Sequence, residues 1–324
     1  MFLSFVTAAA VSATTLLSSV AAPAACAWQV TPVTTPSGST PAKVVVTGTD
    51  GHGDYSGYEL LGGQDTRFIL WNQGQPEVQP SPGDTTLTVD QNASGTVLLT
   101  AFVNGQRQIF TFDGSHTGSG AFTPVRLPAG YDSASAAAIN DRGDIVGSAR
   151  RTADRHSVAI LWSTLSTGSG PTVIDSPEDT WTGAVDVDED GTVLLGGGYK
   201  VLLWKNGEVT PLSLTPSIPR ALRGGTAVGM DLRSDGTHGI LWNGPKDPRY
   251  LDASTSAEDI NAHGLIAGEN TDGTAAAWQG TQSLGALPLP PRATAATATV
   301  VGDDGTILGA AGDAGPVAWR CAVR

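Results

Sequence analysis

The chain of 324 residues has few cysteines, few methionines and a small share of charged side chains. Its 18 Lys and Arg stand against 31 Asp and Glu, which gives a formal net charge of −13. Nucleic acids and anionic membranes bind clustered Lys and Arg, so neither is the expected partner. The 2 cysteines are too few for a disulfide framework or a multi-cysteine metal site. Instead, 41 glycines and 20 prolines favour short strands joined by turns over a helical bundle.

Long apolar runs are also scarce, and the one that exists opens the sequence. It covers Phe2 to Val20 and is followed by Ala22-Pro23-Ala24, the A-x-A pattern cut by signal peptidase. We therefore expect residues 1–24 to be a signal peptide and the product to be secreted and extracellular. A membrane anchor and lipidation at Cys26 are the alternatives. Ser and Thr dilute the run and Pro23 follows it, which disfavours an anchor. Pro23 also stands three positions before Cys26, where a lipidation site would carry a Leu-like residue.

An apolar segment that ends in an aromatic residue recurs through the rest of the chain. The spacing between successive aromatic residues ranges from 36 residues (Trp242 to Trp278) to 50 residues (Phe112 to Trp162). HEAT repeats have a similar length, but they need long amphipathic helices. Here the segments are short, β-branched and separated by Gly, as in four-stranded propeller blades. The sequence predicts an all-β single propeller of seven blades over residues 25–324, with six blades as the alternative. The seven aromatic residues are Trp71, Phe112, Trp162, Trp204, Trp242, Trp278 and Trp319.

Each repeat contains a polar turn and, in three copies, a proline strand. Ile139 to Gly143 and Ile260 to Gly264 show the turn, in which Asn or Asp bonds its own backbone and Gly supplies a positive φ. Val30-Thr31-Pro32-Val33, Phe122 to Val125 and Val209 to Leu212 are the proline copies. Because proline lacks an N–H, these segments are expected to be the outermost strands of their blades.

The copy at Val30 precedes the first full repeat, whereas the last repeat stops soon after Trp319. We expect the N-terminal strand to complete the last blade and close the ring. The register of the fourth repeat then places Cys26 beside Cys321, and a disulfide between them would tie the two ends. Two unpaired thiols, or loss of Cys26 by cleavage after Ala27, are the alternatives. Intact mass with and without reductant distinguishes them.

Two segments carry a family resemblance. Ala138 to Gly147 followed by Ala159 to Trp162, and Ile260 to Gly268 followed by Ala277-Trp278, resemble the HAF-repeat family of secreted bacterial proteins. The resemblance implies propeller-like repeats and export. It transfers no catalytic residue, because the family has no settled activity. The His-Ala-Phe of the family's name is absent here.

One turn has the alternating acids of a calcium loop, at Asp186, Asp188 and Asp190. Leu194 and Gly197 stand where calcium loops of known types carry a further acid, and ordinary turn chemistry explains the segment equally well. Calcium is the only cofactor that the sequence suggests. Arg142-Gly143-Asp144, an integrin-ligand tripeptide, and the sequon at Asn92 fall in equivalent turns.

The chain has no nucleophile elbow, metal-binding His pair or phosphate loop, so we expect a non-catalytic binding or interaction module. Its ligand, an extracellular glycan or protein, would bind the irregular insertions of a monomer. The basic cluster Arg150 to His156 would anchor an acidic ligand, such as a phosphorylated or uronic-acid polymer of the cell envelope, or is merely a solvated hairpin tip. The candidate ligand-binding residues are His52, Tyr55, Arg150, Arg151, Arg155 and Trp181.

The alternative function is a glycan-active hydrolase or lyase. Such an enzyme needs two or more carboxylates that converge on the central channel. The candidates are Asp54, Glu59, Asp188 and Asp190.

Overall fold

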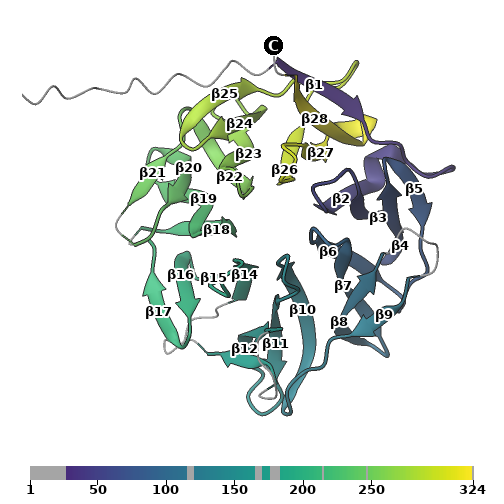
Figure 1. Ribbon diagram of the computed structural model, residues 1–324, viewed down its shortest axis with the longest axis vertical. Helices are drawn as coiled ribbons and strands as arrows, with labels where there is room; N and C mark the ends of the chain where they lie inside the picture. The colour runs from purple at the N-terminus through teal and green to yellow at the C-terminus, as the bar shows by residue number, and fades with distance from the viewer. Residues whose placement is uncertain are drawn as a thin grey trace, which may run out of the picture.

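The computed structural model describes residues 27–114, 120–164, 170–175, 183–213, 215–245 and 247–322. Their strands form seven antiparallel sheets of four strands each. The sheets stand like blades around a central channel (Figure 1). The prediction of an all-β propeller with seven blades is therefore confirmed.

The blades follow one another along the chain, and in all but the last the four strands are consecutive. Blade 1 has β2 (Val44–Thr49), β3 (Tyr55–Gly62), β4 (Asp65–Asn72) and β5 (Gln75–Val78); blade 2 has β6 (Thr86–Gln91), β7 (Thr96–Val103), β8 (Gln106–Asp113) and β9 (Phe122–Pro124); blade 3 has β10 (Tyr131–Ile139), β11 (Ile145–Arg151), β12 (Ser157–Trp162) and β13 (Thr172–Ile174). Blade 4 has β14 (Gly183–Val187), β15 (Val193–Gly197), β16 (Lys200–Lys205) and β17 (Glu208–Pro211); blade 5 has β18 (Ser217–Arg223), β19 (Thr226–Arg233), β20 (Gly236–Trp242) and β21 (Pro248–Tyr250). Blade 6 has β22 (Ser254–Ile260), β23 (Leu265–Asn270), β24 (Ala275–Gln279) and β25 (Gln282–Ala286); blade 7 has β26 (Thr297–Val301), β27 (Ile307–Ala310), β28 (Pro316–Ala322) and β1 (Ala27–Pro32).

The hydrophobic core lies between neighbouring blades rather than inside one sheet. The second strands are continuous apolar runs because both of their faces are covered: Val97, Leu98 and Leu99 of β7 are all fully buried. One side of β7 packs on Phe68 of blade 1, and the other side packs on Ile139 of blade 3. Each blade therefore depends on both neighbours for its burial.

Blade 7 is completed by the start of the chain, as predicted. β1 pairs antiparallel with β28, with Val30 opposite Trp319 and Ala27 opposite Ala322 (Figure 1). Cys321 is not a free thiol. Its predicted partner Cys26 lies outside the described residues, as does the expected signal peptide, so the pairing and the leader stay predictions.

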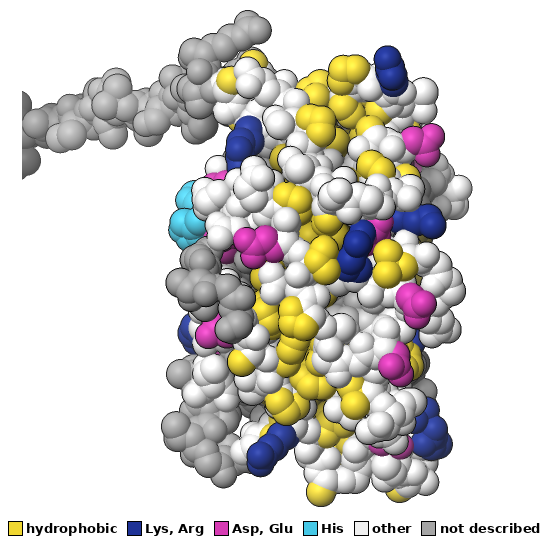
Figure 2. All heavy atoms as spheres, turned by 90° about the vertical axis from the view of Figure 1, so that its right-hand side faces the viewer, with side chains coloured by type: hydrophobic (Ala, Val, Ile, Leu, Met, Phe, Trp, Pro, Cys, Tyr) yellow, Lys and Arg dark blue, Asp and Glu magenta, His cyan; other side chains and the backbone are white. Residues whose placement is uncertain are grey.

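The proline strands occupy the outer edges of their blades. Pro32, Pro124 and Pro211 lie on β1, β9 and β17, the outermost strands of blades 7, 2 and 4. Outer strands of blades 1 and 5 also contain proline, at Pro76 and Pro248. Figure 2 shows part of this outer wall, where apolar side chains lie between charged ones. Proline and charge both discourage pairing of these edges with another chain.

The two flat faces of the ring carry different sets of turns and connections. The antiparallel strand order puts the turns between first and second strands, such as residues 140–144, on one face, which we call the turn face. The hairpins between second and third strands, such as residues 152–156, lie on the opposite face with the blade connections, and we call this the loop face. The described helices are η1 (Pro41–Lys43) and η2 (Gly312–Ala314), and within the described ranges no helix is long enough to span a membrane.

Candidate functional site

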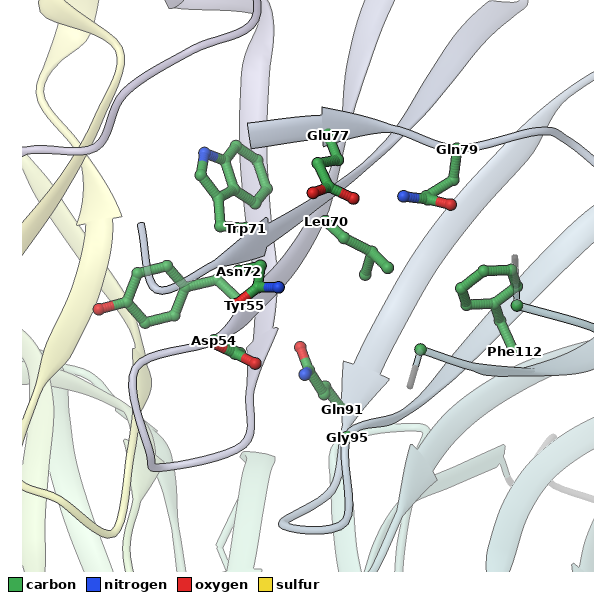
Figure 3. A pocket seen from close by; sticks show the side chains of 12 residues that line it. Asp54, Tyr55, Leu70, Trp71, Asn72, Glu77, Gln79, Gln91, Gly95 and Phe112 are labelled. Carbon is green, nitrogen blue, oxygen red and sulfur yellow. The ribbon is translucent and has the colours of Figure 1, made fainter. Parts of the chain in front are cut away.

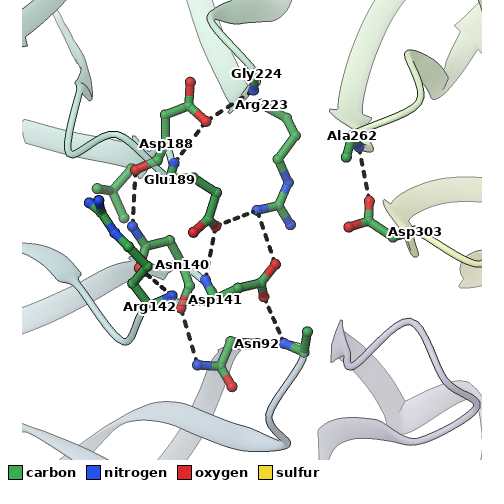
Figure 4. Close-up of polar contacts among 12 residues, drawn as sticks. Asn92, Asn140, Asp141, Arg142, Asp188, Glu189, Arg223, Gly224, Ala262 and Asp303 are labelled. Atoms are coloured by element: carbon green, nitrogen blue, oxygen red, sulfur yellow. Dashed lines mark hydrogen bonds and ion pairs between the residues drawn. The ribbon is translucent and has the colours of Figure 1, made fainter.

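The Asn and Asp side chains of the turn face bond to the next blade. Asn92 Nδ2 of blade 2 donates to the Asn140 carbonyl of blade 3 at 3.1 Å, and Asn140 Nδ2 donates to the Asp188 carbonyl of blade 4 at 2.9 Å. The Asp188 carboxylate accepts from the backbone N–H groups of Gly224 and Gly225 in blade 5, at 3.0 and 2.6 Å. Figure 4 shows this chain of contacts, which we call the turn-face girdle. The repeat turns thus form hydrogen bonds between neighbouring blades as well as reversing the chain.

The girdle gives a structural role to both short motifs found in the turns. Asn92 of the sequon is buried, and its amide is already used by Asn140. Arg142 of the Arg-Gly-Asp tripeptide forms an ion pair with Asp144 of the same tripeptide at 2.6 Å. Because Asp144 is fully buried, the tripeptide does not present a free carboxylate.

The predicted calcium loop is also occupied by protein contacts. Asp186 Oδ2 accepts from the Leu222 N–H at 2.6 Å, and Asp190 accepts from Thr192 N and pairs with Lys205. Asp188 belongs to the girdle. Within the described part of the chain, no group of three acidic, His or Cys side chains could hold a metal ion.

Three carboxylates line the central channel, one from every second blade. Residues from all seven innermost strands enclose them around a cavity of about 70 Å³. In each of the three carboxylates, one oxygen accepts a hydrogen bond from the N–H of the next residue in its own strand. The other oxygen accepts from a backbone N–H in the innermost strand of the following blade. These channel carboxylates are Asp90, Asp186 and Asp259, and they reach Ile139, Leu222 and Val301 at 2.9, 2.6 and 2.6 Å.

Enclosure in the channel disfavours the charged form of these groups. Desolvation raises the pKa of Asp90 to about 6, that of Asp259 to about 7 and that of Asp186 to about 8, although backbone N–H bonds oppose the change. Arg223 lies in the same channel and pairs with Glu189 at 3.1 Å. At about 70 Å³ the cavity is far smaller than the roughly 300–1,000 Å³ of small-molecule pockets.

The carboxylates predicted for an enzyme do not come together. Asp54 and Glu59 belong to blade 1, whereas Asp188 and Asp190 belong to blade 4, across the ring (Figure 1). Asp54 Oδ1 accepts from Gln73 Nε2 at 2.9 Å. Burial opposes ionisation of Glu59, but hydrogen bonds from Arg67 and Ser39 hold its pKa below the usual range. Each of these acids has a structural partner.

One of the two predicted ligand residues of blade 1, Tyr55, lines a small cavity between blades 1 and 2. Figure 3 shows Leu70 and Gln91 pointing into it, whereas the Tyr55 ring points away. The buried Tyr55 hydroxyl accepts from Arg320 Nη2 at 2.9 Å. The cavity measures about 40 Å³, enough for one water. His52 is exposed in the turn between β2 and β3.

The basic candidates lie elsewhere, at the blade 3 hairpin of the loop face. Arg150 and Arg151 are the last two residues of β11. Arg155 lies in the hairpin turn that follows and has a φ of 65°. The structure therefore separates the candidates of blade 1, on the turn face, from those of blade 3. Trp181 lies outside the described residues.

A larger pocket opens beside Arg150 on the loop face, between blades 2, 3 and 4. It has a volume of about 390 Å³, and two arginines and four serines are among its lining residues. We call it the Arg107 pocket. Its lining residues are Arg107, Ser133, Ser135, Ala136, Ala137, Ser148, Ala149, Arg150, Ser157 and Ala184.

Two arginines of different blades supply the charge of this pocket. Arg107 Nη1 reaches Ser135 Oγ at 3.5 Å, and its guanidinium lies 5.3 Å from the Phe102 ring centroid. Arg150 Nε donates to Asp132 at 3.0 Å. Ser133 forms a bulge in β10 and has a φ of 51°, a conformation that Gly normally supplies. Sequence reasoning found Arg150 but missed Arg107, which stands alone in its hairpin.

No family model matches the chain, and no curated protein matches it. Solved structures do: the β-propeller domain of the Trilobed protease from Pyrococcus furiosus has a TM-score of 0.56 at 12% identity, covering 76% of this chain and 86% of that one. A puromycin hydrolase mutant has a TM-score of 0.58 at 13% identity, covering 86% of this chain. Our chain spans only 52% of that hydrolase. These likenesses show the propeller fold alone, and membership of the HAF-repeat family stays a prediction.

Proposed function

We propose that this protein is a secreted, non-catalytic binding propeller that takes an acidic glycan of the cell envelope or extracellular space in the Arg107 pocket. The observation that carries the proposal is the meeting of Arg107 and Arg150 with four serines around one 390 Å³ space. This basic pocket stands out on a chain with a net charge of −13.

The chemistry of the pocket suits an acidic sugar. A guanidinium presents planar N–H donors that match carboxylate and phosphate oxygens, and a serine hydroxyl can both donate to and accept from sugar hydroxyls. Ligand pockets measure roughly 300–1,000 Å³, and this one falls in that range. Among the described residues, Arg150 already has a carboxylate partner, Asp132, whereas the contacts found for Arg107 are with Ser135 and the Phe102 ring.

The geometry favours binding over glycan hydrolysis. Channel carboxylates do converge, but Asp90, Asp186 and Asp259 each use both oxygens to hold backbone N–H groups. This chain covers only 52% of the similar puromycin hydrolase, so that likeness supports the propeller scaffold and not an activity. The apolar leader and the resemblance to HAF repeats support export.

Calorimetric titration of the full chain tests the proposal. We expect binding of oligogalacturonate, no binding of a neutral cello-oligosaccharide, and about tenfold weaker binding in Arg107→Ser, since a charged hydrogen bond contributes about 1.5–3 kcal/mol. Arg249→Ser is the matched control: it removes the same charge from the outer strand of blade 5, where Arg249 pairs with Asp247 at 2.8 Å. Equal binding of the neutral sugar, or equal affinity of both variants, would contradict the proposal.

A further inference from the structure

We infer that the bound ligand is a linear anionic chain, which continues from the Arg107 pocket across β14 at Ala184 into a second subsite beside Tyr199. This inference rests on the proposed function and specifies the length and shape of its ligand. It follows from a second pocket, from the turn that holds Tyr199, and from the different chemistry of the two spaces.

The second pocket lies between blades 4 and 5, also at the loop face. Its volume is about 290 Å³. Ala184 of β14 lines both this pocket and the Arg107 pocket, so the two spaces meet over one residue of the innermost strand. The two pockets are thus neighbours on either side of this strand. The lining residues of the Tyr199 pocket are Gly183, Ala184, Val185, Gly196, Gly197, Gly198, Tyr199, Ser217, Ile218 and Pro219.

Tyr199 occupies a turn position that disfavours a large side chain. Gly197 pairs with Lys200, so Gly198 and Tyr199 form a two-residue hairpin turn, with φ values of 57° and 63°. Such turns normally carry Asn-Gly or Gly-Gly. A bulky residue in this left-handed region costs on the order of 1 kcal/mol.

The equivalent hairpin of blade 2 follows the turn rule. There Asn104 and Gly105 adopt φ values of 51° and 76° between the same strands of the blade. Blade 4 instead keeps a strained tyrosine with 62% of its surface exposed. An exposed aromatic ring in a strained turn, on the wall of a pocket, is typical of a side chain retained to contact a ligand.

The two pockets differ in the chemical groups that they offer. The Arg107 pocket offers guanidinium and hydroxyl donors, which suit an acidic group. The Tyr199 pocket offers an aromatic ring and the apolar side chains of Val185, Ile218 and Pro219, which suit the C–H face of a sugar ring. A polymer that alternates charge with apolar ring or carbon surface fills both at once. The charged group can be a uronate carboxylate or a phosphodiester.

Length dependence of binding tests the inference. We would titrate the full chain with oligogalacturonates from monomer to hexamer, and in a parallel arm with glycerol phosphate oligomers of matched lengths. Whichever series binds identifies the source of the acidic group. Affinity should rise about tenfold or more with length in the native chain, because the second subsite becomes occupied.

Variants at Tyr199 separate this inference from the proposed function. Tyr199→Asn suits the turn and should abolish the gain with length, while it leaves the shortest bound oligomer unaffected. Tyr199→Phe keeps the ring and should keep the gain. Arg107→Ser should weaken oligomers of every length. Binding that is independent of length, or a gain that survives Tyr199→Asn, overturns the second subsite; failure of both polymer series to bind overturns the proposed function itself.

Discussion

The turn face and the loop face are built from the same repeat, but the turn face is bonded between blades whereas the loop face has open pockets. On the turn face, Asn140 and Asp188 each reach the following blade, so the polar groups of the turns are satisfied by neighbours. On the loop face, Ser133 and Tyr199 hold strained backbone conformations beside open pockets. The turn face therefore carries the contacts that stabilise the ring, and the loop face carries the open pockets that we propose bind a ligand.

Removal of a girdle carboxylate should give the largest effect. Asp188→Ala removes a buried carboxylate that accepts hydrogen bonds from the backbone N–H groups of Gly224 and Gly225 in the next blade. We expect a loss of about 3 kcal/mol in the free energy of unfolding, measured by urea denaturation.

Asp190→Ala is the matched control, because Asp190 lies in the same turn. Its side chain is 54% exposed and pairs with Lys205 at the surface. A change below about 1 kcal/mol is expected, since surface ion pairs contribute little. Equal losses in the two variants would mean that the girdle does not hold the blades together.

The channel carboxylates make stability depend on pH. The pKa values of Asp90, Asp259 and Asp186 in the folded protein, about 6, 7 and 8, lie above their ordinary value of 3.8. Between these limits the folded state holds protons that the unfolded state has released, so unfolding releases protons. The free energy of unfolding should therefore fall as pH rises from about 4 to about 8.

Asp186→Asn tests the source of this slope. The variant cannot titrate at position 186, so the fall in melting temperature between pH 5 and pH 9 should become shallower. The native chain and the exposed-site variant Asp247→Asn should keep the full slope, because Asp247 lies on the surface. A profile that is the same in Asp186→Asn and in the native chain would show that this carboxylate does not titrate in the range.

Tryptophans at the ends of third strands donate hydrogen bonds to the segments that lead into the blades, and loss of one such bond should have a moderate effect. Trp278 Nε1 donates to the Asp252 carbonyl at 2.9 Å. Trp278→Phe should lower the free energy of unfolding by about 1 kcal/mol. Trp242 occupies the same register, but its buried Nε1 has no hydrogen-bond partner among the described residues. Trp242→Phe should therefore cost less than Trp278→Phe, and the reverse order would contradict this account.

A substitution in the loop-face turn should have the smallest effect, and in the opposite direction. Tyr199→Asn places a residue that tolerates positive φ at position 199. We expect an increase of about 0.5–1 kcal/mol in the free energy of unfolding. Asn104→Tyr in blade 2 makes the converse change and should lower stability by a similar amount. A loss in Tyr199→Asn would show that its turn is not strained.

Much of the fold could be predicted from the sequence, because strand periodicity and turn chemistry are local. The recurrence of an aromatic residue, at Trp71 and its equivalents, predicted the number of blades. The proline strand at Val30 predicted that the start of the chain closes the ring. The girdle was missed since the Asn140 turn was interpreted as bonding only its own backbone. The channel carboxylates did leave a signal in the sequence: Asp90, Asp186 and Asp259 each stand two residues before the Asn or Asp of a turn, in alternate blades.

The candidate site could not be predicted in the same way. Arg107 and Arg150 lie in different blades, and only the packing of β8 beside β10 brings them to one pocket. Tyr199 gave no signal either, because its strain appears only once Gly197 and Lys200 are known to pair. Sites formed between blades depend on contacts that no single repeat contains.

The pairing of β1 with β28 also orders the folding of the ring. These strands are neighbours in space but stand at opposite ends of the described chain, with Ala27 opposite Ala322. Every other blade can form from consecutive strands, whereas blade 7 needs the largest chain separation in the molecule and the highest cost of loop closure. We therefore expect the pairing of β1 with β28 to be the last step in the formation of the ring.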